Sequence, residues 1–196
     1  SLPNTANTYY VYAIANPTPA AAGCRPFQEI QVIVKALPTA TISGATTICS
    51  GGTTSITFNG TANAIVTYTI NGGANQTITL NAAGTNSVST AALTANATYA
   101  IVSVATGGTP NCSQIISGQS ALVTVKALPT ATISGTTTIC SGGTTSITFN
   151  GTANAIVTYT INGGANQTIA LNAAGTNSVS TAALTANATY AIVSVA

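Results

Sequence analysis

Apolar and polar residues alternate along most of this chain with the period of a β-strand. A period of two puts successive side chains on opposite faces, so each alternating run predicts a strand with one buried face. The enrichment in Thr, Val, Ile and Tyr agrees, because these residues favour strands. The apolar positions of the clearest runs are Ile56 and Phe58, then Val66, Tyr68 and Ile70, then Ile78 and Leu80, and finally Tyr99, Ile101 or Val102, and Val104.

Glycine and asparagine separate these runs at points where a chain reversal needs a positive φ. The segment Asn71-Gly72-Gly73 predicts a hairpin, and it recurs as Asn162-Gly163-Gly164. Seven short antiparallel strands in about 90 residues favour a sandwich of two sheets. The expected strands lie at about residues 39–48, 53–59, 64–70, 76–81, 85–90, 97–105 and 118–126.

The whole pattern occurs more than once. Residues 34–105 recur as residues 125–196, at a shift of about 91 residues, and only Ala45/Thr136 and Thr79/Ala170 differ. Self-similarity at a fixed long period is typical of tandem modules. We expect residues 1–35 to be the C-terminal part of a preceding diverged repeat, residues 36–126 a complete repeat, and residues 127–196 the N-terminal part of a third repeat that stops early.

Charged side chains are nearly absent, and the chain has neither His nor Asp. One Glu without His cannot build a catalytic dyad or triad, so we expect no enzyme and no cofactor. Three basic residues do not make a nucleic-acid surface, and metal sites need carboxylate or His clusters. The longest apolar runs, such as residues 64–70, are far shorter than the roughly 18 residues of a spanning helix, so we expect no membrane span.

One segment resembles a known family. It is Leu93-Thr-Ala-Asn-Ala-Thr-Tyr99 with the alternating residues after it. This segment resembles the Leu-to-Tyr corner and sixth strand of fibronectin type III and related immunoglobulin-like (Ig-like) domains. Leu184 and Tyr190 match it in the next copy. The resemblance implies an all-β chain of tandem Ig-like antiparallel β-sandwiches, in which the Tyr hydroxyl ties the corner to nearby backbone. The alternative is that Tyr99 simply fills the core.

A narrower resemblance covers nearly the whole repeat. Residues 37–44, 46–52, 68–73 and 75–78 are similar to Ig-like repeats of giant surface adhesins of the Bacteroidetes, which include the large adhesin of flavobacterial gliding motility. The resemblance implies export by the type 9 secretion system and a place on the outer surface of a bacterial cell.

Near-identical copies indicate that the repeats add length to the chain and that none of them forms a unique binding pocket. We therefore expect stalk or spacer repeats of a very large secreted cell-surface adhesin, serving gliding motility or surface attachment. Its partners would be the neighbouring repeats, the secretion or surface-motility machinery, and a surface or glycan ligand. Because the chain has little charge to keep molecules apart, a self-assembling filament or sheath of laterally associated chains is the alternative. A carbohydrate-binding module would need exposed aromatic residues, for which Tyr9, Tyr10 and Tyr12 are the candidates.

Each repeat carries two cysteines, one before the second strand (Cys49, Cys140) and one before the last (Cys24, Cys112). In a secreted chain, one pair per repeat predicts a disulfide. The simplest pairing is Cys49 with Cys112, with the partners of Cys24 and Cys140 outside this sequence. The first and last loops of a sandwich lie at opposite poles, so this bond requires residues 106–119 to fold back. Otherwise Cys49 bonds to the facing pole of the next repeat.

The junctions between repeats are short. Pro38 and Pro129 follow the last strand of one repeat closely, and proline restricts its own φ and the preceding residue. We expect limited bending there and a semi-rigid rod. Lys35 and Lys126 mark the strand ends, where a solvated charge also discourages edge pairing.

Overall fold

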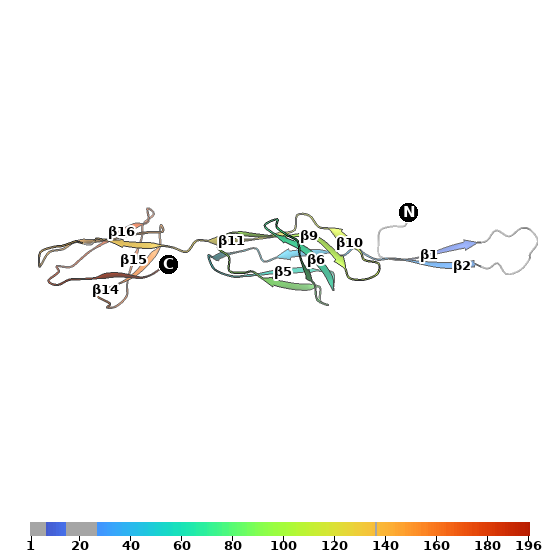
Figure 1. Cartoon of the computed structure of the whole chain (residues 1–196), viewed down its shortest axis with the longest axis horizontal. Helices are drawn as coiled ribbons and strands as arrows, with labels where there is room; N and C mark the ends of the chain where they lie inside the picture. Colours follow the sequence, from blue (N-terminus) through green and yellow to red (C-terminus); the bar gives the residue numbers. More distant parts are fainter. Residues whose placement is uncertain (1–6, 15–26, 136) are drawn as a thin grey trace, which may run out of the picture. The chain divides into compact units, whose positions relative to one another are not determined.

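The computed structural model describes residues 7–14, 27–135 and 137–196, and all the regular elements in them are β-strands (Figure 1). The strands form several antiparallel sheets, which confirms the all-β prediction. The chain divides into two compact units, Ser1–Val125 and Lys126–Ala196. No helix in the described ranges is long and apolar enough to cross a membrane.

The first unit begins with a two-stranded antiparallel sheet. Its strands are β1 (Asn7–Ile14) and β2 (Phe27–Val34), with Asn7 opposite Val34 and Ile14 opposite Phe27.

Residues 40–126 form two further sheets. One has the strand order β3-β5-β8 and the other β4-β11-β9-β6-β7, with β10 also pairing with β9. The strands of the smaller sheet are β3 (Ala40–Ser43), β5 (Ser55–Gly60) and β8 (Thr85–Ser89). Those of the larger sheet are β4 (Thr46–Cys49), β6 (Ala64–Ile70), β7 (Gln76–Thr79), β9 (Ala97–Thr106), β10 (Ser113–Ile115) and β11 (Ser120–Lys126).

Two of these elements differ from the expectation. The single strand predicted at 39–48 is two strands, β3 and β4, which belong to different sheets. The break falls at Gly44, whose φ is 113° and where a Cβ atom would lie 2.6 Å from the carbonyl oxygen of Ser55. Glycine alone fits this close approach, so the chain can change sheets there. The short strand β10 was not predicted, because three residues carry too little alternation to be recognised.

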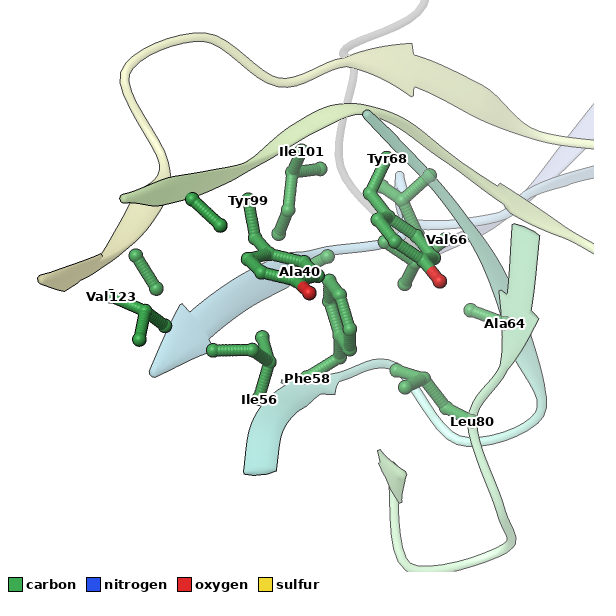
Figure 2. Close-up of a cluster of buried hydrophobic side chains, with 13 residues drawn as sticks. Ala40, Ile56, Phe58, Ala64, Val66, Tyr68, Leu80, Tyr99, Ile101 and Val123 are labelled. Carbon is green, nitrogen blue, oxygen red and sulfur yellow. The ribbon is translucent and has the colours of Figure 1, made fainter. Parts of the chain in front are cut away.

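The core lies between the two sheets of the complete repeat (Figure 2). Ile56 and Phe58 of β5 are fully buried, and the Phe58 ring centroid lies 4.9 Å from that of Tyr68 on β6. The Tyr68 ring in turn stacks on Tyr99 of β9 at 6.4 Å. Alternate residues of both sheets thus meet in one apolar layer, which gives a sandwich-like architecture.

The second unit repeats part of this arrangement. Its core again contains a Phe–Tyr–Tyr series, with ring centroids 4.9 Å apart for Phe149 and Tyr159 and 6.2 Å apart for Tyr159 and Tyr190. It has two three-stranded sheets, ordered β12-β13-β16 and β15-β14-β17. The strands are β12 (Ala131–Ser134), β13 (Ser146–Gly151), β14 (Ile156–Ile161), β15 (Gln167–Ala170), β16 (Thr176–Ser180) and β17 (Tyr190–Val195).

Candidate functional site

The two cysteines of the complete repeat lie at opposite ends of β9. Cys49 ends β4, and the following Gly51 donates a backbone hydrogen bond to the carbonyl of Leu93, where the chain enters β9. At the other end, the Thr106 amide donates to the carbonyl of Cys112 at 2.9 Å, and the Cys112 amide donates to the Thr106 hydroxyl at 3.1 Å. A ten-residue strand such as β9 spans about 30 Å.

This separation corrects the expected disulfide. Cys49 and Cys112 are both free thiols, because a disulfide needs Cα atoms within about 7 Å and the length of β9 holds the two cysteines apart. Residues 106–119 do not fold back toward Cys49, since β10 pairs with the end of β9 close to Cys112. Cys140 is also a free thiol and is exposed, while Cys24 lies outside the described residues. A bond between neighbouring repeats stays a prediction.

The corner from Leu93 to Tyr99 is built from backbone pairing and packing. Leu93 forms an isolated bridge with Gly52 and packs against the core, and its counterpart Leu184 forms the same bridge with Gly143. Tyr99 is buried, 3% exposed, with its ring stacked on Tyr68. Within the described part of the chain its hydroxyl has no hydrogen-bond partner, so the packing role is what the structure shows.

The junction before the complete repeat is bonded to β10 and to the loop that precedes it. Pro38 is fully buried, and its carbonyl accepts a hydrogen bond from Nε2 of Gln114 at 2.6 Å. Exposed Lys35 donates a longer bond of 3.4 Å from Nζ to the carbonyl of Thr109. Lys35 and Pro38 were predicted junction residues, whereas Gln114 was not, because nothing in the local sequence pattern marks a glutamine that bonds to a residue far away in the chain.

The junction after the complete repeat is anchored on both sides. The Val125 amide donates to Oδ1 of Asn96 at 2.8 Å, within the first unit. The Thr130 amide donates to the hydroxyl of Thr152 at 3.0 Å, within the second. Between these anchors lie four residues, from exposed Lys126 to half-buried Pro129.

The described residues include few titratable side chains. Groups of three or more His, Cys, Asp or Glu side chains that could hold a metal do not occur among the described residues. Burial raises the pKa of Tyr68 and of Tyr99, and the nearby Tyr68 adds to the effect on Tyr99. Raised phenol pKa values oppose ionisation and supply no acid or base near neutral pH. Tyr9, Tyr10 and Tyr12 belong to β1, but their side chains lie outside the described part of the molecule.

The second unit contains a groove that was not predicted from the sequence. Its volume is about 670 Å³. Its apolar lining residues are Ile133, Ile139, Ile147, Leu184, Ala186, Ala188 and Tyr190. The repeat alignment was the signal that could have found it, since the strand β11 of the complete repeat has no counterpart within residues 127–196.

Comparison with known proteins assigns no family. No protein-family model matches the chain, and a search of curated proteins finds no match either.

Proposed function

We propose that these repeats are the stalk or spacer of a very large secreted cell-surface adhesin, built from tandem Ig-like domains of about 91 residues. In this role the modules carry a binding region away from the outer surface of a bacterial cell, for attachment or gliding. Type 9 secretion would export the chain, and the ligand, a surface or glycan, would be bound elsewhere.

The observation that carries this proposal is the anchoring of the junction. Val125 is bonded to Asn96 and Thr130 to Thr152, so each end of the connection is tied to its own unit. Only residues 126–129 remain between the two anchors, and Pro129 restricts one of them. A connection this short limits the angles that successive units can adopt, which suits a spacer better than a pair of freely moving domains.

The close similarity of the two units supports the same role. The second unit reproduces the Phe–Tyr–Tyr core of the complete repeat almost unchanged. Tyr68 and Gln76 are bonded at the same distance as Tyr159 and Gln167. Copies that differ so little offer no unit a chemistry of its own, whereas length grows with each copy.

Small-angle X-ray scattering tests the stalk. The 196-residue chain would be compared with one that carries an additional copy of residues 36–126 inserted after Lys126. We expect the maximum dimension to increase by about 30–40 Å, the length of one strand layer with its loops. A Leu128→Gly, Pro129→Gly variant is the matched control, and it should broaden the distance distribution. An unchanged maximum dimension would contradict the proposal, and antibody labelling of intact cells would test the surface location.

A filament or sheath is the second candidate, because several large apolar side chains are exposed in a chain with almost no charge. They include Ile115 at 84%, Val193 at 55% and Ile156 at 50% exposure. Light scattering against concentration separates the two candidates. A stalk keeps one mass across the series, whereas filament subunits give a mass that rises with concentration.

A further inference from the structure

We propose that Asn71 and Asn162 are modification sites, at which the backbone nitrogen of the following glycine attacks the side-chain amide and converts asparagine into aspartate and isoaspartate. The fold protects the other two Asn-Gly pairs of the chain, Asn59-Gly60 and Asn150-Gly151, from the same reaction. The inference concerns the hairpin turns and does not depend on a stalk function.

The reaction needs only water and the chain itself. The glycine nitrogen gives up its proton to the solvent and forms a bond to Cγ of the asparagine, and negative charge develops on Oδ1. The Cγ–Nδ2 bond then breaks, ammonia leaves after taking up a proton, and a cyclic succinimide remains. Water opens this ring at either carbonyl, which gives aspartate or isoaspartate. Glycine favours the ring closure because it has no Cβ atom to obstruct the attack.

The Asn71-Gly72 turn leaves the attacking nitrogen accessible. Both residues are exposed, and the Gly72 amide donates no hydrogen bond within the described part of the chain. A Cβ atom placed on Gly72 would meet nothing within 4 Å, so no other segment packs on the turn. Inside the turn, one backbone bond of 2.9 Å joins the Gly73 amide to the Ile70 carbonyl. An exposed turn of this kind opens locally at a low free-energy cost, which lets the nitrogen approach Cγ.

A backbone amide already faces the oxygen on which the charge would develop. The Thr98 amide, near the start of β9, donates to Oδ1 of Asn71 at 2.8 Å. The Thr189 amide donates to Oδ1 of Asn162 at 2.7 Å in the second unit. A donor at this distance stabilises the negative oxygen that forms when Cγ is attacked, as oxyanion-hole donors do in acyl transfer.

The Asn59-Gly60 pair has the same two residues in a different setting. Asn59 lies in β5, the central strand of the smaller sheet. The Gly60 amide donates to the carbonyl of Gly84 at 2.8 Å, so its nitrogen is not free to attack. Gly151 makes the same bond to Gly175 at 2.8 Å in the second unit. Reaction at these pairs would first have to break the sheet, which costs more free energy than opening a turn.

The product would change the surface of a nearly uncharged chain. Each conversion replaces a neutral amide with a carboxylate. The formal net charge is +2, so conversion at both turns would neutralise the chain. Aspartate keeps an oxygen that can accept from the Thr98 amide, whereas isoaspartate adds a backbone atom to the turn. Isoaspartate should therefore weaken the link between the β6–β7 hairpin and β9.

Incubation of the native 196-residue chain at mildly alkaline pH tests the sites. After denaturation, trypsin separates Asn71 from Asn162, because cleavage at Lys35 and Lys126 gives one fragment of residues 36–126 and another of residues 127–196. Mass spectrometry with electron-transfer fragmentation locates each converted residue and distinguishes isoaspartate from aspartate. We expect Asn71 and Asn162 to convert at least about tenfold faster than the asparagines of the two protected pairs.

Two controls separate the effect of the fold from that of the sequence. In urea all four Asn-Gly pairs are exposed, so their rates should become similar. The Gly72→Ala variant should convert more slowly at Asn71, because the new Cβ obstructs the attack, while Asn162 in the same molecule keeps its rate. Asn59 reports on the fold of this variant, since it stays unconverted only while β5 is intact.

Three results would overturn the proposal. The first is conversion at Asn71 and Asn162 that is no faster than at Asn59 and Asn150 in the native chain. The second is a preference for the turn asparagines that persists in urea. The third is an unchanged rate at Asn71 in the Gly72→Ala variant.

Discussion

The hydroxyl of Tyr68 donates a hydrogen bond to Oε1 of Gln76 at 3.0 Å, across the hairpin that joins β6 to β7. The same bond links Tyr159 to Gln167 at 3.0 Å in the second unit. The Tyr ring lies in the core while its hydroxyl reaches a side chain at the sheet edge, so one residue connects the apolar layer to the hairpin.

Replacing this hydroxyl should weaken the complete repeat by a modest amount. Tyr68→Phe keeps the ring packed between Phe58 and Tyr99 but removes the donor, and we expect a loss of about 1 kcal/mol in unfolding free energy. Urea unfolding measures it. A double-mutant cycle with Gln76→Ala is the control, since the two losses should not add if the bond is their cause.

The free energy of unfolding should change little from mildly acidic to mildly alkaline pH and should fall in stronger alkali. Few groups titrate between about pH 4 and 9, so the unfolding midpoint should hardly change there. Burial raises the pKa of Tyr68 and of Tyr99, so the folded state keeps its phenol protons longer than the unfolded chain. The associated stability is complete below the ordinary Tyr pKa of about 10 and is lost as the pH rises through the folded pKa values. Urea midpoints from pH 4 to 12 would measure both effects. A steep fall of the urea midpoint below pH 7 would contradict the expected flat region. The Tyr68→Phe variant should lose less stability in alkali than the parent chain.

Gly44→Ala should destabilise the complete repeat strongly. A φ of 113° is unfavourable for alanine, and the new Cβ would meet the Ser55 carbonyl oxygen at 2.6 Å. Backbone strain alone costs about 1–3 kcal/mol. Gly107→Ala is the matched control, because a Cβ there meets nothing within 4 Å. Thermal unfolding followed by circular dichroism would show the difference, and equal midpoints for the two variants would refute the sheet-switching role of Gly44.

The native chain should accept thiol reagents at Cys49 and Cys140 without prior reduction, since both are free and exposed. Cys112 is less accessible and should react more slowly. Mass spectrometry after maleimide labelling measures the uptake, and Ala45 and Thr136 distinguish the two otherwise similar peptides. Recovery of a Cys49–Cys112 crosslinked peptide from the unreduced chain would show that the separation along β9 is wrong.

Much of the local structure was predictable. Alternation located β5, β6, β8 and β9 within two residues at each end, because one buried face imposes a period of two on any short window. The Asn71-Gly72 turn was equally clear, and Asn71 and Gly72 do adopt φ values of 52° and 68°.

The candidate site was less predictable. Lys126 and Pro129 stand out in the sequence, but their anchors, Asn96 and Thr152, do not.

The sequence by itself determined the strands, the hairpin turn, the repeat and the scarcity of charge, since each depends on neighbouring residues or on direct comparison of segments. Only the tertiary structure decided that β3 and β4 enter different sheets and that Cys49 and Cys112 stand at opposite ends of β9. These features depend on which distant strands pair. Strand pairing is set by the packing of whole faces, which no short window of sequence contains.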